Sequence, residues 1–201
     1  QGTFGSFTAA LNFARKGMIN FREVFIGIVF TFIGACVGTV LILFLSAEFL
    51  RIIIPFCLIA IFLYTLLMPK VGDEDRAARM NARAFYVIFG LILGFYDGFF
   101  GPGAGSFWTF AMVALIGLNM KKAVAHTKIL NFTSNIVSLA VFIAGGQILW
   151  TVGLLMGVGQ VLGAYFGSNM VIKKDVKFVR VVFLAVVGAT ILKLVYDRFF
   201  A

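Results

Sequence analysis

This sequence has few charged residues, only two cysteines and a single histidine. Charged residues make up 12% of its 201 positions and hydrophobic residues 62%, with a mean hydropathy of +1.06. An ordinary soluble domain carries about 25% charged residues, so the composition excludes that class. Cys36 and Cys57 lie within apolar runs, where a thiol behaves as a small hydrophobic group. We therefore expect neither a disulfide framework nor a metal site.

The scarcity of histidine also bears on chemistry. The chain has neither a His-Glu-x-x-His nor a Gly-x-Ser-x-Gly motif, and one histidine limits acid–base catalysis. We expect no enzyme activity and no cofactor.

Long apolar runs dominate what the sequence does have. They cover 24–45, 49–68, 148–172 and 178–196, and each is near the ~20 residues that span a bilayer core as a helix. An open sheet edge cannot lie in lipid, and the alternation typical of membrane barrels is absent. We therefore predict an all-α polytopic membrane protein. The net charge of +9 lies mainly in short turns between spans, so the lipid bilayer, and not nucleic acid, is the expected partner.

The chain also repeats part of itself at an offset of 129 residues. The identical positions include Phe13 and Phe142, Gly17 and Gly146, Ile19 and Ile148, Gly34 and Gly163, Ala35 and Ala164, and Gly38 and Gly167. The positive charges do not repeat in step. The first copy carries Arg15, Lys16 and Arg22 around its Gly17 turn, whereas the second has Lys173, Lys174 and Lys177 at its next turn. Basic residues mark the cytoplasmic side, so we predict two inverted-topology repeats, which are typical of secondary transporters.

The repeat sets the predicted domain boundaries. Residues 1–68 form the C-terminal part of repeat 1, 69–83 a cytoplasmic linker, and 84–201 repeat 2. Residues 84–129 precede the second copy and have no counterpart ahead of the first. We therefore expect an N-terminally truncated fragment.

A broken helix pair is predicted within repeat 2. Residues 84–100 and 106–118 flank a turn that contains Gly101, Pro102, Gly103 and Gly105. The second piece, at about 20 Å, is too short to cross the core. Free N–H groups from Gly103 to Phe107 would favour an anion, with the Ser106 hydroxyl near the helix start. A turn that only allows close packing is the alternative. Asp97 is either a functional carboxylate or a brace that accepts N–H groups of the turn.

A polar stripe follows on the next predicted span, 122–144. This span carries seven polar residues: His126, Thr127, Lys128, Asn131, Ser134, Asn135 and Ser138. Five of them share one helical face, namely Thr127, Asn131, Ser134, Asn135 and Ser138. Lys128 is the expected counter-charge for an anion. The matching segment of repeat 1 has a small-residue stripe: Gln1, Gly2, Gly5, Ser6 and Ala9. Both faces should point inward, either for interhelical hydrogen bonds or for a substrate pathway. Glycines of the repeated spans (Gly27, Gly34 and Gly38; Gly153, Gly157, Gly163 and Gly167) are expected to serve packing, and Gln160 to reach a cavity.

The segments 94–107 and 125–135 resemble the TauE/SafE family of membrane transporters, in particular its YfcA-like branch. They read Gly-Phe-Tyr-Asp-Gly-Phe-Phe-Gly-Pro-Gly-Ala-Gly-Ser-Phe and Ala-His-Thr-Lys-Ile-Leu-Asn-Phe-Thr-Ser-Asn. The resemblance implies a multi-pass permease of a bacterial inner membrane that handles sulfite, organosulfonates or related sulfur compounds.

Together these features predict a secondary transporter of a small anion, with a passive anion channel as the alternative. The expected anion ligands are the turn (Gly101, Gly103, Gly105 and Ser106) and the stripe (Thr127, Lys128, Asn131, Ser134 and Asn135). Asp97 is the candidate to bind a coupling proton.

Overall fold

The computed structural model describes residues 1–45 and 74–174, and the single positions 178, 181, 185 and 189. The helices are α1 (Gly2–Arg15), α2 (Phe21–Leu43), α4 (Ala82–Phe99), α5 (Ala104–Ala111), α6 (Met120–Ala144) and α7 (Trp150–Lys173). A π-helical turn, η1 (Met112–Ile116), continues α5. These ranges contain no strand, and α2, α4, α6 and α7 are long and apolar enough to cross a membrane. The all-α polytopic prediction is confirmed; the span predicted at 48–68 and most of 178–199 lie outside the described residues.

Several helix boundaries follow from local side chains. Asn81 and Asn119 precede α4 and α6, and their side-chain oxygens accept the N–H groups of Arg83 (2.8 Å) and Lys122 (3.0 Å). Such caps satisfy donors that have no partner within the helix.

The two turns of the sequence repeat have the same geometry. Gly17 and Gly146 both have positive φ, +67° and +66°. Each donates its N–H to the third residue before it, with N···O distances of 3.0 Å. The residue after each glycine, Met18 or Gln147, donates in turn to Phe13 or Phe142, both at 3.1 Å. The match at offset 129 is therefore a match of local structure.

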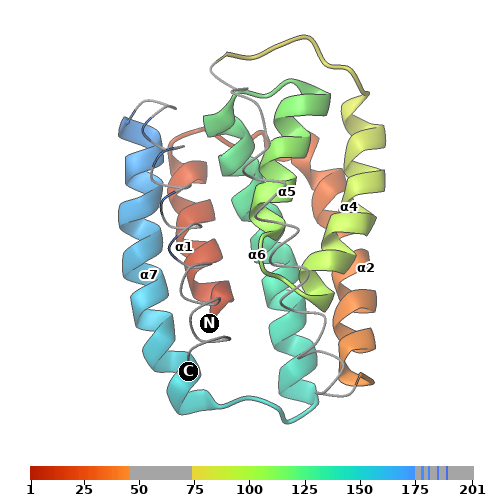
Figure 1. Cartoon of the computed structure of the whole chain (residues 1–201), viewed down its shortest axis with the longest axis vertical. Coiled ribbons are helices and arrows are strands. Elements are labelled where there is room, and N and C mark those ends of the chain that lie inside the picture. Colours follow the sequence, from red (N-terminus) through yellow and green to blue (C-terminus); the bar gives the residue numbers. More distant parts are fainter. Residues whose placement is uncertain (46–73, 175–177, 179–180, 182–184, 186–188, 190–201) are drawn as a thin grey trace.

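Helices α2 and α4 pack with their backbones almost in contact (Figure 1). A Cβ atom added at Gly34 would lie 2.4 Å from the carbonyl oxygen of Leu91, and one at Gly38 would lie 2.2 Å from that of Phe95. Only glycine allows this approach. The packing role expected for these two glycines is confirmed.

Helices α1, α2, α4 and α5 all pack against α6, and α7 packs against α1. Helix α1 packs against α6 and α7, whereas α2 packs against α6 and α4 (Figure 1). Large apolar side chains such as Phe25 on α2 and Leu155 on α7 are exposed at 63% and 72%, as expected for surfaces that face lipid.

The predicted broken helix pair is present. Helix α4 ends at Phe99, and α5 begins at Ala104 after a turn in which Gly101 and Gly103 have φ of +84° and +79°. The second helix starts two residues earlier than the predicted 106. Its π-helical end was not predicted. There, the Leu115 carbonyl accepts the N–H groups of Arg79 (2.8 Å) and Met80 (3.0 Å). The backbone of the linker is therefore hydrogen-bonded to the end of η1.

Candidate functional site

A cavity of about 440 Å³ lies among α1, α6 and α7. Its lining is Gly2, Gly5, Ser6, Ala9 and Phe13 of α1, Val124, Lys128, Asn131 and Asn135 of α6, and Gly159, Gln160, Gly163, Ala164, Gly167, Ser168 and Val171 of α7. The small-residue stripe of the first copy therefore meets part of the polar stripe of the second. The inward orientation expected for both stripes is confirmed at these positions, and so is the expectation that Gln160 reaches a cavity.

The cavity exists because α7 presents glycines to it. Among the described residues, no atom lies within 4 Å of a Cβ atom added at Gly159, Gly163 or Gly167. The packing role expected for Gly163 and Gly167 is therefore not seen among the residues that the structure describes. Gly157 does serve packing, because an added Cβ atom would lie 2.8 Å from the ring of Phe4. One helix thus uses glycine both for close contact and for open space.

Lys128 supplies the charge of this cavity. It is the one charged residue among the lining residues, and within the described ranges it forms no ion pair. The carboxylate that interacts with it electrostatically is Asp97 of α4. A positive charge with neutral amide and hydroxyl neighbours favours an anion in a site of low dielectric constant.

Asn131 adds an amide that is not fully bonded. Its Oδ1 atom is buried and has no hydrogen-bond partner within the described part of the chain. A buried polar atom without a partner is costly, so a ligand or a water that bonds this amide stabilises the site. Rotation of the amide by 180° would present its N–H groups to an anion instead.

Asn135 lies one turn farther along α6, beside α1. Its side-chain Nδ2 atom donates to Ser6 Oγ at 3.3 Å, and its backbone carbonyl oxygen accepts the Thr3 hydroxyl at 3.2 Å. A Cβ atom at Gly2 would lie 2.8 Å from Asn135 Oδ1. Asn135 therefore both lines the cavity and holds α1 against α6.

Asp97 and Ser134 contact each other instead of the cavity. The Ser134 hydroxyl donates to Asp97 Oδ2 and connects α6 to α4. The predicted alternative, a brace that accepts N–H groups of the glycine turn, is not what the structure gives, because the recorded partner of this carboxylate is a side chain on another helix.

The glycine turn lies behind the Asn131 wall of the cavity. A Cβ atom at Gly105 would lie 3.1 Å from Asn131 Nδ2, whereas Gly101, Gly103 and Ser106 are outside the cavity lining in the described part of the structure. The expectation of free N–H groups from Gly103 to Phe107 is wrong for three of the five. Ala104 donates to Gly101, and Ser106 and Phe107 donate to Gly103, because the turn closes on its own carbonyls. At most Gly103 and Gly105 can offer an N–H group to a ligand.

Thr127 makes an interhelical contact. It is 1% exposed, and its hydroxyl lies 3.1 Å from that of Thr109 on α5. This residue joins α5 to α6 and does not reach the cavity, so the interhelical alternative holds for this part of the stripe.

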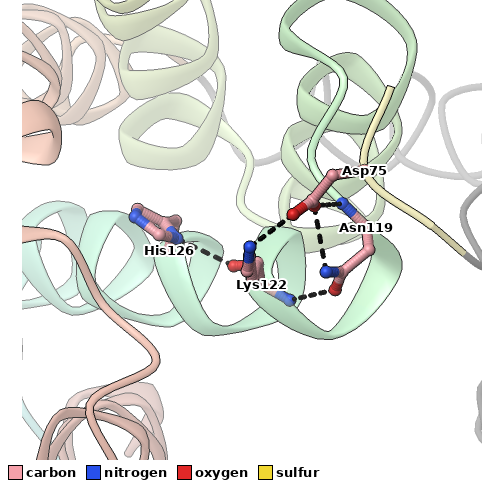
Figure 2. A network of polar contacts seen from close by, with 4 residues as sticks. All are labelled: Asp75, Asn119, Lys122 and His126. Atoms are coloured by element: carbon pink, nitrogen blue, oxygen red, sulfur yellow. Dashed lines mark hydrogen bonds and ion pairs between the residues drawn. The ribbon is translucent and has the colours of Figure 1, made fainter. Parts of the chain in front are cut away.

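A second polar cluster lies at the end of α6 where the basic residues gather. Figure 2 shows Asp75 of the linker bonded to Lys122 and to Asn119, whose N–H and Nδ2 donate at 2.7 and 3.0 Å. The hydrogen bond from Lys122 holds the pKa of the Asp75 carboxyl below its usual value. His126 Nδ1 lies 2.8 Å from the Lys122 carbonyl, and its Nε2 accepts the Asn20 N–H at 3.2 Å. The Nε2 atom of this buried histidine therefore fixes the turn between α1 and α2 to α6, while its Nδ1 atom bonds within α6.

Sequence reasoning did not single out Asn12 and Ser168. Asn12 Nδ2 donates to Ser168 Oγ at 2.7 Å, from α1 to α7 at the end of the cavity. The repeat contained a signal for Ser168, because offset 129 pairs it with another hydroxyl residue, Thr39.

Comparison with known proteins gives one consistent result. The family model described as "Sulfite exporter TauE/SafE" matches residues 1–194. The chain is 45% identical over 197 residues to the Escherichia coli K12 "Probable membrane transporter protein YfcA", covering 98% of this chain and 73% of that protein. It is 43% identical over 202 residues to a "Probable membrane transporter protein" of Haemophilus influenzae, covering 98% and 78%. No solved structure matches. The chain is therefore a multi-pass membrane protein that belongs to the TauE/SafE family of membrane transporters.

Proposed function

We propose that this protein is a secondary transporter of a small anion in a bacterial inner membrane, with sulfite and organosulfonates as the substrate class. The observation that carries the proposal is Lys128: a cation without an ion pair in the described residues lines a cavity that also presents amide and hydroxyl groups. Asn131, Asn135 and Gln160 supply amide groups around it. The description of the matching family, which names sulfite, supports the substrate class.

Two inverted repeats are the framework of this proposal. Figure 1 supports it, because α1 and the matching half of α6 run in opposite directions, as do α2 and α7. The Asn135–Ser6 hydrogen bond joins positions 129 residues apart, which are equivalent in the repeat. Inverted repeats are related by a twofold axis, and a residue near that axis contacts the equivalent residue of the other repeat. The Asn135–Ser6 contact is of this kind. Secondary transporters bind substrate at the interface of such repeats.

A carrier fits the cavities better than the alternative, a passive channel. A second cavity of about 480 Å³ shares Gly2 and Asn135 with the first. At that shared point a Cβ atom on Gly2 would lie 2.8 Å from Asn135 Oδ1. The α1 backbone at Gly2 and the side chain of Asn135 therefore lie close together where the two cavities meet, which favours a path that opens when α1 moves relative to α6.

Proton coupling follows from charge balance. Lys128 interacts with the carboxylate of Asp97, and a bound anion would compete with Asp97 for that positive charge. Protonation of Asp97 removes the competitor, because an uncompensated charge in a low-dielectric site is costly. Anion binding and proton binding would then favour each other.

Counterflow in proteoliposomes tests the carrier directly. Liposomes preloaded with unlabelled sulfite, methanesulfonate or sulfoacetate are diluted into a trace of the same labelled anion. A carrier accumulates label transiently, with a rate that saturates. Flux that rises linearly with concentration and shows no counterflow would favour the channel, and absence of flux for the whole panel would contradict the substrate class.

A further inference from the structure

Two buried hydroxyl residues occupy equivalent positions in the repeat. Thr39 of α2 and Ser168 of α7 are 129 residues apart in the sequence. Their side chains are 0% and 4% exposed. Neither lies in a turn, and both face helices of the other repeat, as their hydrogen bonds demonstrate.

The two hydroxyls use their bonding capacity in the same way. Thr39 Oγ1 donates its one proton to the Gly98 carbonyl at 3.0 Å, so it accepts from the Ser138 hydroxyl at 2.8 Å. Ser168 Oγ donates to the Tyr165 carbonyl at 3.2 Å and accepts from Asn12 Nδ2 at 2.7 Å. Each hydroxyl therefore accepts a side-chain hydrogen bond from a helix of the opposite repeat.

The two contacts lie at opposite ends of the helices. Asn12 and Ser168 are near the ends of α1 and α7 that lead into the basic residues Lys16 and Lys173 (Figure 1). Thr39 and Ser138 are near the other ends, those of α2 and α6. We name the Asn12–Ser168 contact the inner latch and the Thr39–Ser138 contact the outer latch, because basic residues mark the cytoplasmic side.

We propose that these latches, within the proposed carrier function on which this inference rests, hold the repeats together at the two membrane faces and open one at a time. Rocking of one repeat against the other separates helix ends on one side only. The latch on that side must break while the opposite one stays formed. With both latches formed, as here, α1 and α2 are held to α7 and α6 at both faces.

Thiol labelling from each side of the membrane tests this proposal without a substrate. The background is Cys36→Ala with Cys57→Ala, and the reporter is Gln160→Cys, which lines the cavity. A membrane-impermeant methanethiosulfonate reagent is added either to spheroplasts, which expose the outer face of the membrane, or to inverted vesicles, which expose its cytoplasmic face. Thr39→Val should raise the labelling rate from outside at least about threefold, because one membrane hydrogen bond corresponds to a population shift of about threefold and the variant removes two, to Gly98 and to Ser138. Ser168→Ala should lower the rate from outside and raise it in inverted vesicles.

Thr31→Val is the matched control. Thr31 lies on the same helix as Thr39, and its buried hydroxyl has no partner within the described residues. This change should leave both labelling rates unaltered. Shifts of the same sign for Thr39→Val and Ser168→Ala, as general loosening of the protein would give, overturn the proposal, and so does the absence of any shift. Opposite shifts in a protein that lacks counterflow would contradict the carrier function and not the latches.

Discussion

At the scale of single residues, the candidate site combines one charged side chain with several polar groups. The polar residues of α6 do not all contribute to it. Lys128, Asn131 and Asn135 reach the cavity. The hydroxyls of Thr127 and Ser134 form hydrogen bonds with residues of other helices. One helical face contacts more than one neighbouring helix, so some residues of the stripe line the cavity and others bond to other helices.

Asp97→Asn tests proton coupling at this scale. The amide keeps the size of the carboxylate and accepts the Ser134 hydroxyl but cannot take up a proton. We expect the wild type to accumulate methanesulfonate up to about tenfold per pH unit across the liposome membrane. The variant should lose this dependence on the pH gradient while its counterflow persists. Methanesulfonate is the anion of a strong acid and stays deprotonated over this pH range, so the pH change acts on the protein and not on the substrate. Unchanged pH-driven accumulation would leave Asp97 with a structural role only.

Gly105→Ala tests whether the glycine turn supports the cavity wall. The added methyl group would lie 3.1 Å from Asn131 Nδ2, which is tighter than ordinary contact, so Asn131 must shift. Because α5 can accept alanine without backbone strain, the thermal midpoint should change little. The concentration for half-maximal counterflow should rise several-fold. Wild-type values for this variant would separate the turn from the site.

At the scale of elements, equivalent helices have acquired different surroundings. Gly34 and Gly163 are equivalent in the repeat, yet the first touches the α4 backbone and the second faces the cavity. The sequence predicted α2 and α7 from long apolar runs, which in lipid admit only a spanning helix. It also predicted α4 and α6 close to their bounds, as the spans 84–100 and 122–144. The sequence could not show which glycines serve packing and which line a cavity, because both situations accept glycine.

Gly34→Ala and Gly163→Ala form a matched pair for this difference. The first should lower the free energy of unfolding by about 1–3 kcal/mol, because its methyl group collides with the Leu91 carbonyl. The second has open space and should be neutral or slightly stabilising, since alanine favours helix. Thermal unfolding of the purified variants in detergent measures both. Equal destabilisation would mean that another element covers Gly163.

At the scale of the whole molecule, the proposed inversion of the two repeats predicts the side of the membrane on which each turn lies. Met18 and Gln147 are equivalent, and both follow a glycine of positive φ. Cysteines placed at these two positions should label from opposite sides of the membrane, Gln147→Cys from the side opposite the basic turns. Labelling of both from the same side would remove the basis for inversion.

The site as a whole was only partly predictable. Periodicity predicted that Asn131 and Asn135 lie on an inward face, because lipid leaves polar groups no other direction. Lys128 was predicted as a buried charge that needs an anionic partner. The contacts of Asp97 with Ser134, and of Asn12 with Ser168, depend on how helices far apart in sequence are placed side by side. No local pattern encodes that placement.

Removal of the cavity charge tests the central claim most directly. In Lys128→Met, a chain of similar length loses its ammonium group, and Lys16→Met serves as control because Lys16 is exposed in the turn after α1. The measurement is the concentration dependence of counterflow for the best-transported anion of the panel. The account predicts a loss of apparent affinity of about tenfold or more for Lys128→Met, as expected for a charged hydrogen bond, and none for Lys16→Met. Equal affinity in the wild type and Lys128→Met would contradict an anion site in this cavity.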